Sequence, residues 1–151
     1  MVEKLPQLTD DHHYAIANVA VRSAQMEVQI ENTIEVALRN QPKTAEFALK
    51  NLGTDRVVGF LEALLMDSRP SDAMETGNLI AKIRALRIKR NETLHWFWIK
   101  GDAPDTATAA TKRPFREFSF REQTAEEVQT TADEMRTVVH ALLWWQDDLR
   151  K

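Results

Sequence analysis

The segment from Arg90 to His95, with the sequence R-N-E-T-L-H, holds the residue types in this chain best suited to chemistry. An imidazole changes its charge near neutral pH, so His95 can accept a proton and return it. An arginine stays charged and donates two parallel hydrogen bonds to a phosphate, which suits Arg90 to neutralising charge there. Asn91 adds an amide that can orient the phosphate or the histidine. These three side chains predict attack on a phosphodiester.

A long helix must position this segment. Ser71 offers a cap, Asp72 and Glu75 follow it, and basic residues crowd the last turns before His95, as the helix dipole favours. At about 100° per residue, the main apolar positions share one side of the helix: Leu79, Ile83, Leu86, Leu94 and Phe97. Arg90 falls at the centre of that side, where a guanidinium is costly unless it has a partner or a wet groove. An ion pair with another helix would make Arg90 structural, and His95 would then only complement the dipole.

A second side of the same helix is basic. It carries Arg84, Arg87, Asn91 and His95, and Lys82 begins the basic run of this segment two residues before Arg84. The functional interpretation is a groove that follows an RNA backbone through Lys82, Arg84 and Arg87, with Trp98 stacking on a base. The alternative is a solvated helix face, with Trp98 packed in the core or in an interface.

The R-N-x-x-x-H pattern near the end of a long helix resembles the HEPN superfamily, through Arg90, Asn91 and His95. The resemblance implies a helical bundle that forms a homodimer with the two motifs facing each other. It also implies a metal-independent endoribonuclease, a hydrolase that uses the ribose 2′-hydroxyl and leaves a 2′,3′-cyclic phosphate. Such enzymes serve as toxins with antitoxin partners, in abortive infection and in other phage or antiviral defence. Other members are catalytically silent modules that bind RNA, a nucleotide or a partner protein.

The rest of the chain predicts an all-α, antiparallel bundle of about five helices in a single domain over residues 1–151. Capping residues, prolines and glycines predict helices at about 10–40, 44–52, 54–68, 71–95 and 124–149. The first helix carries an apolar stripe at helical spacing, formed by Tyr14, Ala17, Val21, Ala24 and Val28. A short β-hairpin or an irregular insertion is expected around residues 96–121, with the aromatic runs 96–99 and 115–120 paired. The Ala/Thr-rich segment 101–113 is predicted to be a mobile loop.

Composition limits the remaining possibilities. The 151 residues include no cysteine, which excludes a disulfide framework and a thiolate zinc site. The net charge of −3 excludes a globally basic, nucleic-acid-coating protein. No run of apolar residues approaches the roughly 18 needed to span a bilayer, so we expect a cytoplasmic protein without a membrane partner. We expect no cofactor, because the dinucleotide-binding and phosphate-loop fingerprints are absent. We expect no metal ion, because His12 and His13 point about 100° apart on a helix and suit an exposed first turn. Trp144 and Trp145 are expected in a core or a dimer interface.

Overall fold

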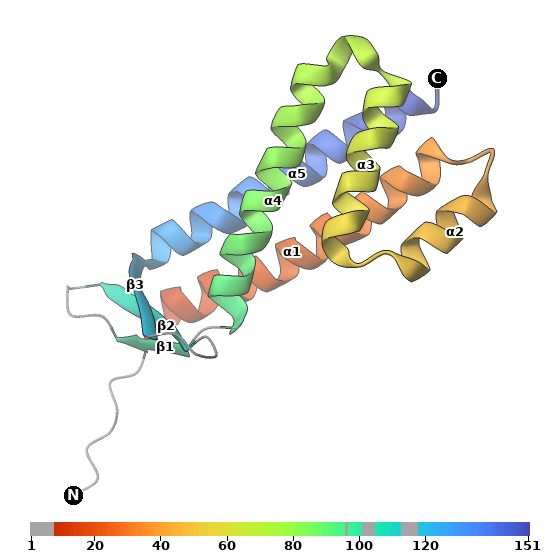
Figure 1. Ribbon diagram of the computed structural model, residues 1–151. Coiled ribbons are helices and arrows are strands. Elements are labelled where there is room, and N and C mark those ends of the chain that lie inside the picture. Colours follow the sequence, from red (N-terminus) through yellow and green to blue (C-terminus); the bar gives the residue numbers. More distant parts are fainter. Residues whose placement is uncertain (1–7, 96, 101–104, 113–117) are drawn as a thin grey trace, which may run out of the picture.

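The computed structural model describes residues 8–95, 97–100, 105–112 and 118–151. These residues form five α-helices: α1 (Asp10–Ala37), α2 (Pro42–Asn51), α3 (Thr54–Ser68), α4 (Ala73–His95) and α5 (Ala125–Leu149). A single 3-10 turn, η1 (Pro70–Asp72), precedes α4. Three strands make a small sheet at one end: β1 (Phe97–Lys100), β2 (Thr106–Lys112) and β3 (Phe118–Thr124). The predicted all-α helical bundle is confirmed, with the sheet at the tip of the molecule (Figure 1).

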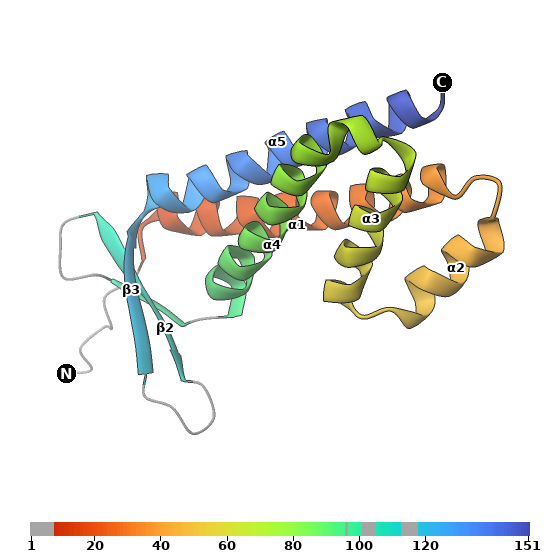
Figure 2. The ribbon, with the colours of Figure 1, turned by 45° about the horizontal axis from the view of Figure 1, so that its top comes forward.

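The first and last helices lie side by side and run in the same direction, away from the sheet (Figures 1 and 2). Near the sheet, His12 Nε2 lies 3.2 Å from the carbonyl oxygen of Gln123. Farther along, the Gln146 amide donates to Gln29 Oε1 at 2.9 Å. α3 and α4 run in opposite directions and cross over one side of this pair. The predicted antiparallel packing therefore holds for α3 and α4, but it is wrong for α1 and α5, which are parallel.

The hydrophobic core lies where α1, α3, α4 and α5 meet. Its largest fully buried side chains include Met26, Ile30, Leu61, Ile83, Met135 and Leu142. The apolar stripe noted in the first helix is not part of this core: Tyr14, Val21 and Val28 are 71%, 55% and 52% exposed. Ala17 and Ala24 between them are exposed as well. Residues such as Ala15, Val19 and Met26, about half a turn around the helix, are the buried ones instead. We call the five exposed residues the outer stripe.

Local signals in the sequence position the starts of α1 and α5, whereas Ser71, the expected cap of the fourth helix, lies within η1. Thr9 caps α1, with its hydroxyl accepting from the backbone N–H of His12. Thr124 and Glu127 form the capping box that opens α5. The expectation that His12 lies in an exposed turn is wrong: its side chain is buried between Thr9 and Gln123. It is buried because β3 ends directly beside the start of α1.

The insertion after α4 is an antiparallel three-stranded sheet in the order β1-β2-β3. Phe97 pairs with Ala110, and Ala110 pairs in turn with Phe120. The two aromatic runs therefore do not pair with each other, because the Ala/Thr-rich segment lies between them as the central strand. The predicted mobile loop over 101–113 is thus wrong for residues 106–112, while residues 101–104 and 113 lie outside the described residues. The alternation T-A-T-A suits a strand, and Ala107 is fully buried.

Candidate functional site

The Arg90–His95 segment forms the last turns of α4, as predicted. The helix is held at this end by Trp98 of β1, whose indole Nε1 donates to the carbonyl oxygen of Thr93 at 2.7 Å. This bond satisfies one of the carbonyl groups that a helix end leaves without a helical partner. Trp98 is half-buried and packs against the core. Its indole N–H is therefore committed to anchoring the strand, and only part of its ring is open to solvent.

Arg87 is the deepest basic residue of this region, with 5% of its surface exposed. Its Nε donates to Glu27 Oε1 at 2.8 Å and its Nη2 to Glu27 Oε2 at 2.5 Å. Its Nη1 donates to the carbonyl oxygen of Thr54 at 2.5 Å. Arg87 thus ties α4 to α1 and to the start of α3. The sequence predicts that Arg87 contacts RNA in an open groove. The structure instead buries this guanidinium against Glu27 and Thr54.

Arg90 lies one turn farther along α4, on the rim of the core. Its side chain is 22% exposed, and its Nη1 is 3.9 Å from Glu27 Oε1. Its Nε and Nη2 donate to Asn91 Oδ1 at 3.1 and 2.8 Å. The two residues that the motif pairs are therefore in direct contact, and the Asn91 amide orients the arginine. A guanidinium has five N–H donors, so Arg90 retains donors for a further acceptor.

His95 is the last residue of α4, and it is exposed. Five residues separate it from Arg90, which corresponds to about 140° around the helix and about 7.5 Å along it. The structure therefore places Arg90 and His95 at the same end of α4 but toward different sides. Arg84, Asn91 and His95 are all exposed, so the predicted basic side of α4 is open to solvent at these positions and closed at Arg87.

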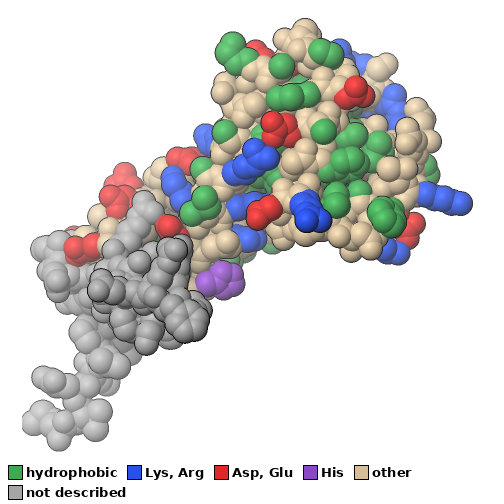
Figure 3. Space-filling view, in the orientation of Figure 1, with side chains coloured by type: hydrophobic (Ala, Val, Ile, Leu, Met, Phe, Trp, Pro, Cys, Tyr) green, Lys and Arg blue, Asp and Glu red, His purple; other side chains and the backbone are tan. Residues whose placement is uncertain are grey.

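Acidic side chains accompany two of the other basic residues of α4. Arg84 pairs with Glu62 of α3 at 3.2 Å, and Lys89 lies 3.7 Å from Glu134 of α5. Lys82 is exposed. Blue and red side chains alternate over the middle of the face drawn in Figure 3. The basic run of the sequence thus becomes a mixed surface on the visible face, because neighbouring helices contribute carboxylates to it.

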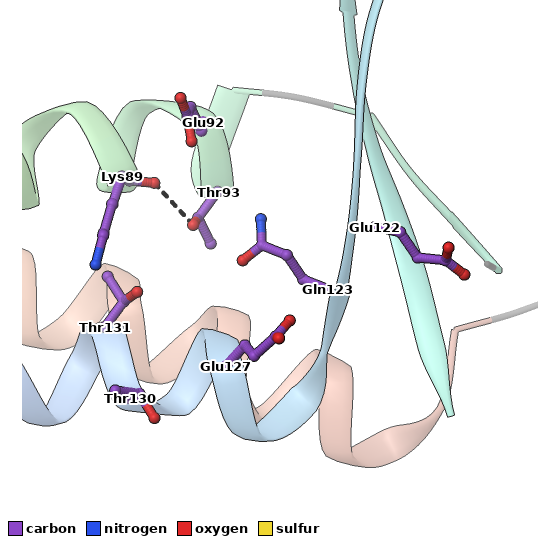
Figure 4. Close-up of a pocket in the computed structure, with 8 residues that line it drawn as sticks. All are labelled: Lys89, Glu92, Thr93, Glu122, Gln123, Glu127, Thr130 and Thr131. Atoms are coloured by element: carbon purple, nitrogen blue, oxygen red, sulfur yellow. Dashed lines mark hydrogen bonds between the residues drawn. The ribbon is translucent and has the colours of Figure 1, made fainter. Parts of the chain in front are cut away.

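A polar pocket of about 400 Å³ opens beside the same helix end, between α4, β3 and the start of α5. Its lining residues are Lys89, Glu92, Thr93, Glu122, Gln123, Glu127, Thr130 and Thr131. The Gln123 amide points into the space between the helices, whereas Glu122 points away across the sheet (Figure 4). Arg90, Asn91 and His95 do not line this pocket, so the motif and the pocket occupy different sides of the end of α4.

Sequence reasoning missed Glu27 and Gln123. Glu27 lies among several acidic residues of α1, and nothing in its local sequence marks it as the partner of an arginine 60 positions away. Gln123 closes the polar pocket only because the sheet folds back toward α5. Both roles depend on tertiary packing, which no spacing rule in the sequence encodes.

Comparison of the chain with protein-family models, curated proteins and solved structures found no match. Within the described residues, no helix has both the length and the hydropathy required to cross a bilayer. The same residues contain no group of three or more histidine and carboxylate side chains arranged to hold a metal ion.

Proposed function

We propose that this protein is a HEPN-type endoribonuclease that cleaves RNA without a metal ion. The observation that carries the proposal is the arrangement at the end of α4. Arg90 is oriented by Asn91 and lies near Glu27, it retains donors for a phosphate, and His95 stands exposed at the helix terminus. The donors left on Arg90 and the exposed His95 are open to a substrate, although the contact of Arg90 with Glu27 is also one that a structural arginine would make.

The reaction would be an in-line transfer within the RNA. The ribose 2′-oxygen bonds to the adjacent phosphorus while the bond from phosphorus to the 5′-oxygen breaks. His95 accepts the 2′-hydroxyl proton or supplies a proton to the leaving 5′-oxygen, a role that contributes about 10²–10⁴-fold in rate. Arg90 stabilises the negative charge that develops on the phosphate oxygens. The products are a 2′,3′-cyclic phosphate and a free 5′-hydroxyl.

The active form would be a homodimer, as the resemblance implies. The outer stripe of α1 offers a face for the second copy, because its residues follow the heptad spacing typical of paired helices. Glu27, which binds Arg87 and reaches Arg90, directly precedes Val28 of this stripe. The stripe lies about half a turn from the face of α1 that packs on α4, so a two-fold contact through it leaves both motifs open to solvent, and each copy would bind RNA through its own Arg90 and His95.

The test compares wild-type protein with Arg90→Ala and His95→Ala on a mixed RNA pool containing EDTA. Arg136→Ala and His140→Ala are matched controls, because both residues are exposed on α5. We expect cyclic-phosphate ends from the wild type and both controls, and at least about a 100-fold loss of rate in each motif variant. Equal cleavage by wild type and motif variants would exclude this mechanism.

A catalytically silent module is the second candidate function, and one observation favours it. Glu27, Glu62 and Glu134 already accompany Arg87, Arg84 and Lys89, so a phosphate backbone would have to compete with carboxylates. Such a module would hold RNA, a nucleotide or a partner protein without cleavage. Fluorescence anisotropy with a 2′-O-methyl RNA separates the two candidates: a silent module binds this RNA, and its wild-type protein leaves ordinary RNA intact.

The resemblance also suggests a biological setting in toxin–antitoxin or phage-defence systems. An active toxin should slow growth when the wild-type chain is expressed alone, and His95→Ala should relieve the effect. Normal growth at equal, folded expression of wild type and variant argues against a free-standing toxin. Co-purification of a neighbouring gene product would identify an antitoxin or defence partner.

A further inference from the structure

Two adjacent tryptophans near the end of α5 have opposite environments. Trp144 is 58% exposed, while Trp145 is 4% exposed and belongs to the core. Their ring centroids are 5.4 Å apart, and their planes meet at 82°. Exposure of a tryptophan is unusual, because its large apolar ring is among the side chains that gain most from burial. Here the buried ring holds the exposed ring in an edge-to-face geometry.

The two rings line a pocket of about 490 Å³ between the C-terminal half of α5 and the start of α4. Leu79 and Ala141 supply the remaining apolar walls, and Asp72 and Glu75 supply two carboxylates. No ion pair among the described residues includes Asp72 or Glu75. We call this the tryptophan pocket. It combines aromatic surface with negative charge that has no internal cation.

We propose that the tryptophan pocket binds a small organic cation with an alkylated ammonium group. The face of a tryptophan ring attracts such a cation more strongly than any other side-chain ring. The alkyl groups would lie against Trp144, Leu79 and Ala141, while Asp72 and Glu75 would balance the positive charge. A phosphate or other anion is disfavoured by the same carboxylates. The concave shape and volume suit a free small molecule.

This site is separate from the proposed ribonuclease motif. Leu79 is the last α4 residue of the tryptophan pocket, and Arg90 lies eleven residues later, about 16 Å farther along the helix. The inference therefore does not depend on the proposed function.

The test is an NMR titration that follows the tryptophan indole N–H signals of the full chain. Tetramethylammonium and choline are the probes, 3,3-dimethylbutan-1-ol is the neutral analogue of choline, and sodium chloride matches the ionic strength. Trp144→Phe assigns the Trp144 signal. We expect saturable shifts at Trp144 with a dissociation constant of about 1–10 mM for both cations. The neutral alcohol should bind at least about 10-fold more weakly.

Variants then locate the site. Trp144→Leu and Glu75→Gln should each weaken choline binding severalfold, read from the Trp145 indole signal. Leu143→Ala is the matched control, because it alters an exposed apolar neighbour that does not line the pocket. Equal binding of the neutral alcohol would overturn the proposal and leave an ordinary apolar surface. The absence of shifts up to about 50 mM of either cation would overturn it as well.

Discussion

Both carboxylate oxygens of Glu27 in α1 accept hydrogen bonds from Arg87 in α4, Oε1 from Nε at 2.8 Å and Oε2 from Nη2 at 2.5 Å. Glu27 Oε1 also lies 3.9 Å from Arg90 Nη1. One carboxylate thus lies beside both Arg87 and Arg90, which differ in burial. Arg87 is buried and completes its bonding at Thr54, whereas Arg90 stays partly exposed. The core therefore holds the helix that carries the candidate chemistry at a fixed angle to α1.

Replacement of Glu27 by glutamine should destabilise the fold. The amide cannot compensate the charge of Arg87, which is buried, so we expect a loss of about 2–4 kcal/mol in the free energy of unfolding. Urea denaturation measures this change. Glu62→Gln is the matched control, because Glu62 pairs with an exposed arginine, and it should cost under about 1 kcal/mol. Similar losses in the two variants would mean that the buried Glu27–Arg87 pair contributes no more to the free energy of unfolding than an exposed pair.

A carboxylate placed in the outer stripe should prevent self-association. Val21 lies at the centre of the stripe and is 55% exposed, so Val21→Glu leaves the core intact while charging the proposed contact. We expect a dimer for the wild type and a monomer for the variant in sedimentation velocity. Phe47→Glu, which charges an exposed apolar residue on α2, should remain dimeric. A monomeric wild type would contradict the proposed interface.

Thr76→Val should stabilise the protein. The hydroxyl of Thr76 is buried, and within the described residues it has no hydrogen-bond partner. Valine keeps the shape and removes the unsatisfied polar atom, so we expect a gain of about 1 kcal/mol in thermal or urea unfolding. Thr137→Val on the exposed face of α5 should bring no such gain, because the Thr137 hydroxyl donates to the Asp133 carbonyl oxygen. A destabilised Thr76→Val protein would indicate a buried water at this site.

Gln146→Leu should loosen the contact between α1 and α5. The buried Gln146 amide donates to Gln29 Oε1 at 2.9 Å and to Thr33 Oγ1 at 3.1 Å. Loss of these bonds removes a donor from the buried Thr33 hydroxyl oxygen and from Gln29, and we expect a cost of about 1–3 kcal/mol. Gln25→Leu, on the exposed surface of α1, should change stability by less than about 0.5 kcal/mol. Hydrogen exchange of the α5 amides would show whether the loosening is local.

The starts of α1 and α5 could be predicted from sequence because they depend on local chemistry. Thr9 and the Thr124–Glu127 pair cap their helices through bonds that span three residues. The contact between Arg90 and Asn91 is equally local, so the core of the candidate site could be found from the sequence motif alone.

The orientation of helix faces could not be predicted in the same way. α1 has two apolar sides, and only packing against α5 and α4 decides that Val19 and Met26 are buried while Val21 and Val28 are exposed. Composition also masked β2, because alanine and threonine suit a loop as well as a strand until neighbouring strands supply hydrogen bonds. Arg87 looked like a surface cation for the same reason, since its partner Glu27 lies 60 positions earlier.

The pairing of α1 with α5 means that the core can close only late in the synthesis of the chain. The most extensive interface between elements joins the first described helix to the last. During translation, the core face of α1 has no α5 to cover it until the chain up to Leu149 has left the ribosome. Closing contacts so far apart in sequence is slow, and the nascent chain exposes apolar surface meanwhile. Ribosome-bound chains that end within α5 should accordingly be more sensitive to protease than released protein.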